Sequence, residues 1–389
     1  MRLGRHSHPD GVNLPVKSPT SWPGGPIRVE VIRNLDQLSE LKWDWERLVR
    51  SSGRASAFST AAAILTWYRL VESHSAVHVV TAWRGDQLVG LAPFSVVRLG
   101  PFRLFATAGA GYGYDGAPLI GAYPAQVEQA ISDYLTNLVA SGMAAIYLRR
   151  LPSDGTMLKI LENNAHLSCM RMGADEARSI IHFGQMQDIE HYFSQVARKH
   201  AVPRRSRRLA ERFGDVEYVI DDPEPGVALD AMRDMMRRRF DGDLRIFRTP
   251  QNRVLTRTLI LELKAAGHAQ ISSMFANGQR ITVTVDIHVG DRKFWWAVAY
   301  EPDLAHYSLG HIELYEFLRN AHCSGASEVD LGSAGFTYKQ RWANVTRHYR
   351  TIAITAPRMR GNIANTLRRA VIRWHRVRRV SATAGPPAV

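Results

Sequence analysis

The sequence predicts a mixed α/β fold built from two similar units in tandem, each a mostly antiparallel meander of strands with flanking helices. Three observations lead to this prediction. The chain of 389 residues is long for one domain and comfortable for two. Hydrophobic residues make up 45% and charged residues 22%, the ordinary range of a globular protein. The two halves also run through the same series of expected elements, which indicates an internal duplication.

Each half starts this series with a helix that leads into a hairpin. Apolar residues recur at helical spacing from Thr60 to His74 and from Thr249 to Ala269, where Thr249 is the expected N-cap and Pro250 the first helical residue. The hairpins follow, with their turns at Arg84-Gly85-Asp86 and Ala276-Asn277-Gly278. Asn-Gly between alternating strands is a strong hairpin signal.

The second part of the series repeats as well. A third strand is expected at Phe102 to Ala106 and at Lys293 to Tyr300, followed in both halves by a loop that contains glycine. An amphipathic helix and a buried strand come next, at Ala125–Ala140 and Ala144–Leu148 in the first half and at Gly310–His322 and Glu328–Leu331 in the second. Both helices end at Ser-Gly, a plausible C-cap.

These patterns divide the chain into four segments. Residues 1–26 mix Pro, Gly, Ser and His without apolar periodicity, so we expect them to be disordered. The two units occupy residues 27–180 and 181–357. Residues 358–389 form a basic helix and a short tail.

The formal net charge of +14 favours anionic partners such as nucleic acid, anionic lipid or a phosphorylated small molecule. The charge gathers in two places, Arg358 to Arg379 and the run Arg198, Lys199, His200, Arg204, Arg205, Arg207, Arg208 and Arg212. No secretory signal and no apolar run of membrane-spanning length occurs, so the sequence predicts a cytoplasmic protein. Cys169 and Cys323 have no Cys or His at metal-ligand spacing and are expected to be incidental thiols.

The most informative segment begins at Ser308-Leu309-Gly310-His311, where a strand is expected to end and a helix to start. The first backbone N–H groups of a helix lack intrahelical partners, and the helix dipole is positive there, so a phosphate is a natural ligand. Gly310 lets a ligand approach the backbone closely. Taken alone, a glycine at such a junction is more often only a turn.

The whole segment resembles the CelD-like branch of the GNAT superfamily of acyltransferases, named for proteins encoded near bacterial cellulose-synthesis genes. Members show a Tyr-Ser-Pro-Gly turn, a helix, Asp-Phe-x-x-Gly and Tyr-Lys-x-x-Trp. The corresponding stretches here are Tyr307-Ser308-Leu309-Gly310, Asp330-Leu331-Gly332 and Tyr338-Lys339-Gln340-Arg341-Trp342. Upstream, His191-Tyr192-Phe193 and the arginine-rich run are similar to the family pattern. The resemblance covers about residues 186–356 well and the first half faintly.

The chain departs from the family pattern in places. Leu309 replaces the expected Pro, and Ser333 stands where an Arg is usual. In the first half, the stretch from Gly109 to Gly116 occupies the place of the glycine turn without resembling it, and Tyr112, Tyr114 and Asp115 could line the acceptor side of a cleft between the units. The resemblance therefore implies a degenerate GNAT-like first unit and a GNAT acyltransferase second unit.

The implied reaction is acyl transfer from acetyl-CoA or another acyl-CoA, without a metal, to an amine or hydroxyl of a cell-envelope or polysaccharide-related acceptor. Ser308, Leu309, Gly310 and His311 would hold CoA. Such transfer needs a base for the nucleophile and an acid for the leaving thiolate. Tyr338 and Tyr307 are candidate acids, Asp330 and Asp286 candidate bases or orienting groups, and Lys339 could pair with Asp330 or meet a phosphate.

Two alternatives remain open. Fem-type enzymes resemble this tandem architecture but take aminoacyl-tRNA as donor, and a basic surface would suit tRNA phosphates. Alternatively, the fold binds CoA without catalysis. The basic stretch from Gly361 to Val380 predicts an amphipathic helix that either contacts an anionic membrane or docks on the protein itself. Metal-site spacing, a P-loop and a serine-hydrolase elbow are missing.

Overall fold

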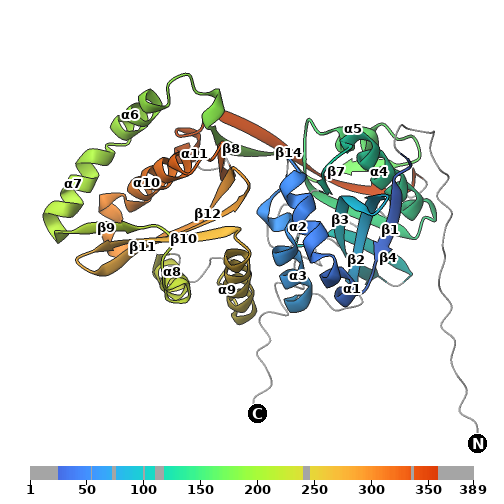
Figure 1. The fold of residues 1–389 in the computed structure, drawn as a ribbon, viewed down its shortest axis with the longest axis horizontal. Coiled ribbons are helices and arrows are strands. Elements are labelled where there is room, and N and C mark those ends of the chain that lie inside the picture. Colours follow the sequence, from blue (N-terminus) through green and yellow to red (C-terminus); the bar gives the residue numbers. More distant parts are fainter. Residues whose placement is uncertain are drawn as a thin grey trace, which may run out of the picture.

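The computed structural model describes residues 25–53, 55–71, 76–99, 101–109, 118–239, 246–333 and 337–357. Two lobes lie side by side, with the first half of the chain mainly in one and the second half mainly in the other (Figure 1). Residues 1–24 of the predicted segment 1–26 lie outside the described residues, as do most of the stretch from Gly109 to Gly116 and the basic helix within 358–389.

A single sheet of 14 strands runs through both lobes in the order β1-β2-β3-β4-β6-β14-β8-β13-β12-β11-β10-β9, with β5 beside β3 and β7 beside β14. The strands are β1 (Arg28–Ile32), β2 (Val77–Arg84), β3 (Gln87–Leu99), β4 (Phe102–Thr107), β5 (Leu119–Ile120), β6 (Ala144–Pro152), β7 (Ser168–Arg171), β8 (Glu176–His182), β9 (Val216–Val219), β10 (Ala269–Ala276), β11 (Gln279–Val289), β12 (Arg292–Tyr300), β13 (Glu328–Ser333) and β14 (Val345–Thr355). Most neighbours are antiparallel, as the mixed α/β prediction requires.

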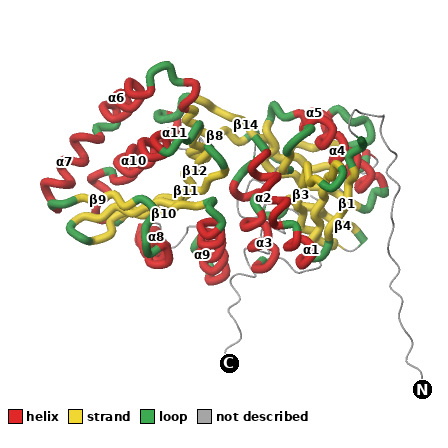
Figure 2. Tube along the Cα trace, in the orientation of Figure 1, coloured by secondary structure: helices red, strands yellow, loops and turns green. Residues whose placement is uncertain are grey.

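Helices cover both faces of the sheet. In the second lobe, α6, α7, α10 and α11 lie on one face, and α8 and α9 lie on the other (Figure 2). The helices are α1 (Leu35–Glu40), α2 (Lys42–Ser51), α3 (Ala61–Leu70), α4 (Pro124–Ala140), α5 (Thr156–Glu162), α6 (Ile189–Lys199), α7 (Val202–Phe213), α8 (Pro225–Arg239), α9 (Pro250–Ala265), α10 (Leu309–Cys323) and α11 (Thr337–Gln340). Short 3-10 turns are η1 (Ala57–Ser59), η4 (Phe183–Gln185) and η5 (Pro302–Tyr307).

The two halves repeat each other in detail. Hairpins β2–β3 and β10–β11 each shift register by one residue just before the turn, between Ala82 and Trp83 and between Met274 and Phe275. Helices α4 and α10 each follow a residue in the left-handed region, Tyr123 and Ser308, with φ of 58° and 57°. Both end at the predicted Ser-Gly. Such matched irregularities support the predicted tandem arrangement.

Local capping explains why the predicted helices begin where they do. Thr60 caps α3 and Thr249 caps α9, since each hydroxyl accepts a hydrogen bond from a first-turn backbone N–H. Pro250 is the first residue of α9, as predicted. The Asn277-Gly278 turn also joins its two strands, with both residues at positive φ.

The end of each half enters the sheet of the other half, an arrangement that the sequence did not predict. Strand β14, from the second half, pairs antiparallel with β6 of the first half and with β8. Strand β8 follows the first half and pairs with β13 of the second. The expected division at residue 180 therefore falls inside β8. We refer to this arrangement as the strand exchange.

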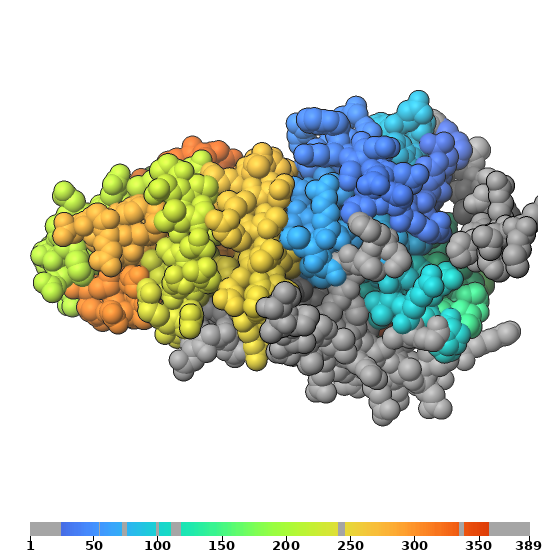
Figure 3. All heavy atoms as spheres, turned by 90° about the horizontal axis from the view of Figure 1, so that it is seen from below, coloured from blue at the N-terminus to red at the C-terminus, as the bar shows by residue number. Residues whose placement is uncertain are grey.

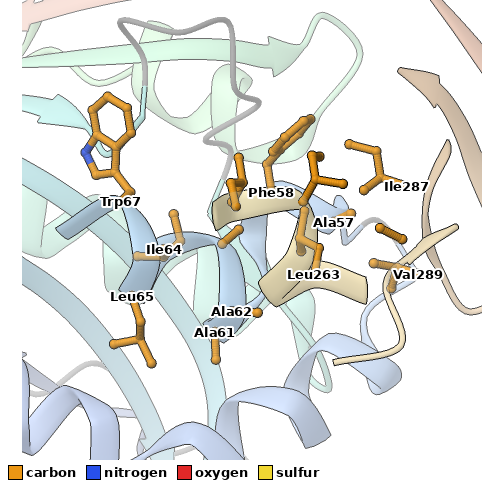
Figure 4. Close-up of a cluster of buried hydrophobic side chains, with 14 of the residues drawn as sticks. Ala57, Phe58, Ala61, Ala62, Ile64, Leu65, Trp67, Leu263, Ile287 and Val289 are labelled. Atoms are coloured by element: carbon orange, nitrogen blue, oxygen red, sulfur yellow. The ribbon is translucent and has the colours of Figure 1, made fainter. Parts of the chain in front are cut away.

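One hydrophobic core spans both lobes. Residues of η1 and α3, including Phe58 and Leu65, belong to the same buried cluster as Leu263, Ile287 and Val289 of the second half (Figure 4). From below, α9 lies directly against the first lobe (Figure 3). A fully buried large apolar side chain stabilises a fold by about 1.5–3 kcal/mol, so this shared core holds the lobes together.

Candidate active site

The predicted helix start is present, and the third strand ends at Tyr300 as expected, so a turn and not a strand leads directly into the helix. Strand β12 stops at Tyr300, η5 follows, and α10 begins at Leu309 after Ser308. A side chain at Gly310 would meet only Tyr300, at 3.8 Å, and the φ of Gly310 is not positive. The packing of the chain itself therefore does not require glycine there, and the space over the helix start is open.

Three aromatic rings stack beside this helix start. The ring of His200, at the end of α6, lies 4.5 Å from that of Trp342 and 4.7 Å from that of His311, nearly parallel to both. Burial lowers the pKa of His200 to about 4 and also lowers that of His311, with the nearby charge of Arg205 acting in the same direction. Both imidazoles are therefore neutral at pH 7.

Several buried polar atoms in this stack lack a hydrogen-bond partner among the described residues. They are Nε2 of His200, Nδ1 of His311, Nε1 of Trp342 and Nη1 of Arg205. Buried polar groups in native proteins are nearly always paired, and leaving one unpaired costs about 1–3 kcal/mol. Their accumulation beside the first amides of α10 marks a place where a polar ligand would complete the site.

Next to this helix the sheet opens between β12 and β13. The two strands pair in parallel only from Arg292 to Phe294, opposite Glu328 to Asp330. Beyond that point, β12 bulges at Trp296, and β13 turns at Gly332, which has a φ of 81°. Where the strands diverge, their backbone N–H and C=O groups do not pair with each other. An extended ligand that lies between the strands could form hydrogen bonds with these groups.

The equivalent strands of the first half stay closed. Strands β4 and β6 pair from Arg103 to Ala106, and the Thr107 hydroxyl continues the contact by donating to the Tyr147 carbonyl at 3.1 Å. It also accepts from the Arg149 backbone N–H. Within the described residues, this difference distinguishes an open slot in the second half from a sealed one in the first.

Lys339 lies at the point where β12 and β13 part. Its ammonium donates to the Leu331 carbonyl and sits 5.9 Å from the ring centre of Trp295, whose indole N–H is buried without a partner among the described residues. Burial lowers the pKa of Lys339 to about 8, although Asp330 opposes the shift. Burial also raises the pKa of the neighbouring Tyr338 to about 12.

Asp330, on β13, is held by two hydrogen bonds. One carboxylate oxygen accepts from the Arg178 guanidinium at 2.9 Å, and the other accepts from the Gly332 backbone N–H at 2.6 Å. Arg178 is itself nearly buried, with Phe294 and Tyr349 rings on either side at 5.5 and 5.1 Å. The pair is therefore rigid, and it joins β8 to β13.

The predicted site residues fall into groups. His311 and Tyr338 are in contact, with ring centres 6.1 Å apart, and Lys339 lies beside the Asp330 strand. Tyr307 lies elsewhere, packed on Phe213 and near Arg208 of α7.

Asp286, the other predicted base, is buried, and its carboxylate lies 3.2 Å from His288 Nδ1. It is therefore engaged in a local pair.

A cavity with a volume of about 1050 Å³ lies between the lobes, where the sequence suggested a cleft between the units. The residues suggested for its lining, Tyr112, Tyr114 and Asp115, lie outside the described residues. The walls of the cavity come from the ends of β6 and β11, the starts of α4, α5, β12 and β13, and β8 and β14. Asp330, Arg178 and Phe294 line it, so it reaches the strands beside Lys339. No single stretch of sequence indicates the residues that line such a cavity. His200 and Arg205 were predicted only as part of a basic run.

The basic run itself forms the end of α6 and much of α7. Arg204, Arg207, Arg208 and Arg212 are exposed, whereas Arg205 is half-buried and its charge acts on both His200 and His311. No helix in the described part of the chain is long and apolar enough to cross a membrane. In that part there is also no group of three or more His, Cys, Asp or Glu residues fit to hold a metal ion.

Comparison with known families agrees with this geometry. The profile of the acetyltransferase (GNAT) domain matches residues 197–340, from the end of α6 to α11. The match includes the helix start, the open strands and Lys339, but covers less than half of the chain. No curated protein matches the chain significantly.

Solved structures share the fold over nearly the whole of their length. FemX is 11% identical with a TM-score of 0.59, over 80% of this chain and 95% of that one. The C-terminal domain (DUF2156) of a putative lysylphosphatidylglycerol synthetase from Agrobacterium fabrum is 11% identical, with a TM-score of 0.54 over 86% and 96%. A protein of unknown function from Bacteroides thetaiotaomicron is 13% identical, with a TM-score of 0.51 over 85% and 99%.

At these identities the likeness to solved structures concerns the fold alone. Together with the GNAT match and the internal repeat, it defines a mixed α/β protein of tandem GNAT-like halves with an acyltransferase domain in the second half. The predicted fold class is confirmed.

Proposed function

We propose that the protein is an acyl-CoA-dependent acyltransferase that modifies an amine or hydroxyl of a cell-envelope or polysaccharide-related acceptor, with acetyl-CoA as its donor. The observation that carries the proposal is the open slot between β12 and β13 next to a helix start with unpaired buried polar atoms. Membership in the CelD-like branch stays a prediction.

The residues at this site fit the donor. The first amides of α10, at Leu309 and Gly310, together with His311, His200 and Arg205, would hold its phosphates, because a helix start and a guanidinium both bind anions. Gly310 leaves the space that this approach needs. When bound, acyl-CoA supplies an acyl thioester and a thiol leaving group.

We assign the acid role to Lys339 in preference to Tyr338. A cysteine thiol has a pKa of about 8.5 and an ordinary alkyl thiol a higher one, whereas the pKa of Lys339 is about 8, so a proton passes from the ammonium to the leaving thiolate without a free-energy cost. With a pKa of about 12, Tyr338 holds its proton too tightly for this task. In our proposal it packs against His311 and shapes the slot.

Asp330 orients the nucleophile from the cavity side. Its carboxylate faces the cavity and accepts hydrogen bonds from Arg178 and Gly332, which stabilise its ionised form. It is therefore suited to hold an amine or hydroxyl in place while solvent takes the proton. The donor and the acceptor would meet at the divergence of β12 and β13.

Calorimetric titration with acetyl-CoA tests the donor assignment. Gly310→Val should weaken binding about tenfold or more, because the side chain fills the space over the helix start, while the melting temperature stays close to that of wild type. Gln251→Val is the matched control, since Gln251 holds the same position, the second residue of its helix, in α9 and is exposed there. It should leave acetyl-CoA affinity unchanged. Failure of wild type to bind acetyl-CoA would sink the donor assignment.

A second candidate donor, an aminoacyl-tRNA, is favoured by the four exposed arginines of α7. If the protein binds tRNA tightly, with an affinity that falls steeply as salt rises, and does not bind acetyl-CoA, then aminoacyl-tRNA is the donor in place of acyl-CoA. Binding of acetyl-CoA without release of free thiol for any amine or hydroxyl acceptor would identify a non-catalytic CoA-binding protein instead.

A further inference from the structure

The walls of the interlobe cavity differ in character. The first-half wall contains an apolar set, namely Ala57, Pro118, Leu119, Ile120, Leu151, Met157 and Leu158, beside serines and the charged residues Glu128, Arg150 and Asp154. The wall made by β8, β12, β13 and β14 is charged and includes Arg178, Arg292, Lys293, Glu328, Asp330 and Arg347. An amphipathic molecule would match both walls.

The carboxylates of the charged wall are already engaged by arginines. The pairs are Arg150 with Glu176 at 2.7 Å, Arg178 with Asp330 at 2.9 Å and with Glu176 at 3.6 Å, and Arg347 with Glu328 through two hydrogen bonds. Arg292 stands apart from these pairs. Among the described residues, its guanidinium makes one hydrogen bond, to the neutral Ala55 carbonyl at 2.7 Å.

The charged wall therefore has one arginine, the half-buried Arg292, that forms no ion pair with a carboxylate among the described residues. Burial lowers the pKa of Arg292, which reflects the cost of keeping its charge away from water, although Glu328 and Asp291 offset part of that cost. The cavity also receives the start of α4 at Pro124 and Ala125, the positive end of a long helix. An anion in the cavity would compensate both.

The distance from Arg292 to the proposed transfer point limits the shape of this ligand. Arg292 and Phe294 are two residues apart on β12, so their side chains share a face, and Asp330 is the partner of Phe294 on β13. Two residues of a strand span about 7 Å. A molecule that contacts both Arg292 and Asp330 needs its two polar groups several bonds apart.

We propose that the acceptor is an amphipathic anion whose carboxylate or phosphate binds Arg292, whose apolar body lies on the first-half wall, and whose amine or hydroxyl reaches Asp330. This inference rests on the proposed function, because it names the acceptor class of the same site. Arg292 is a binding residue and takes no part in proton transfer.

Paired probes with and without the anionic group test the proposal by binding alone. One pair is 6-aminohexanoate and 6-aminohexanamide, and the other is 4-aminobutyl phosphate and 4-aminobutanol. Ligand-observed NMR titrations of the full chain should show that at least one anionic probe binds about tenfold or more tightly than its neutral counterpart, as expected for a charge-assisted bond. The pair that responds distinguishes carboxylate from phosphate.

Arg292→Gln should abolish that preference, and Arg292→Lys should restore part of it. Arg28→Gln removes the same charge from exposed β1 and should leave the preference intact. Equal binding of charged and neutral probes to wild type, or a preference that survives in Arg292→Gln, overturns the proposal. Acetyl-CoA titration of the same samples separates the acceptor hypothesis from the proposed function. If acetyl-CoA binds and the anionic probes show no preference, the acceptor class is wrong and the proposed acyltransferase function still stands.

Discussion

Replacing Glu313 by Gln should remove a large pH dependence from the stability of the protein. Glu313 lies on α10, one turn after the proposed donor site, and its side chain is fully buried against β11. The Thr282 and Thr284 hydroxyls lie 2.7 and 2.6 Å from its two carboxylate oxygens. Burial nevertheless raises the pKa of Glu313 from 4.5 to about 7.

The sign of the effect follows from proton binding. Between pH 4.5 and 7 the folded protein keeps the Glu313 proton, whereas the unfolded chain loses it, so the free energy of unfolding falls as pH rises through this window. Each pH unit contributes about 1.36 kcal/mol, which gives a total of roughly 3 kcal/mol. The stabilisation is complete below pH 4.5 and lost above pH 7.

Urea denaturation followed by tryptophan fluorescence from pH 5 to pH 8 measures this effect. The difference in unfolding free energy between Glu313→Gln and wild type should change by about 3 kcal/mol over the range, in favour of the variant at high pH. Glu316 is nearby on α10 and its pKa is also raised by burial, so Glu316→Gln is the matched control and should show a smaller change. A difference that stays constant with pH would refute the reasoning.

Two further predictions concern the transfer point and the sheet. If Lys339 is the acid, the kcat of wild type should fall as pH rises through about 8, because the ammonium loses its proton. Lys339→Gln should lose most of the activity and also this fall in kcat at high pH. A variant that keeps the same fall in kcat contradicts the role of Lys339. A chain ended at Asn344 lacks β14 and should lose its near-ultraviolet circular dichroism as a whole, since β14 pairs with strands of both halves; a folded first lobe would argue against this coupling.

The elements that could be predicted from sequence carry local signals. Thr249 and Pro250 mark the start of α9, Asn277-Gly278 marks a hairpin, and the helix after Ser308 begins as expected. Each depends on a few neighbouring residues whose backbone preferences are strong. The order of strands inside each half followed from the same kind of information, because consecutive antiparallel strands usually pair.

The features that could not be predicted depend on contacts between distant parts of the chain. Arg178 meets Asp330 across 152 positions, and Arg292 meets Ala55 across 237. Nothing in the neighbouring residues indicates such partners, so these contacts and the residues that line the cavity could not be predicted. Asp286 shows that sequence reasoning can also suggest too much. A carboxylate in a strand is a candidate base in the sequence, whereas in the structure it contacts His288, a structural partner.

The strand exchange also bears on how such a protein can evolve after its gene is duplicated. The first half has closed the slot that the second half keeps open, so under the proposed function it takes no part in donor binding. It nevertheless cannot be deleted or split off as a separate gene, because β6 supports β14 and β8 completes the edge of β13. Mutations can therefore reshape the first-half wall of the cavity while the ancestral fold of that half is retained.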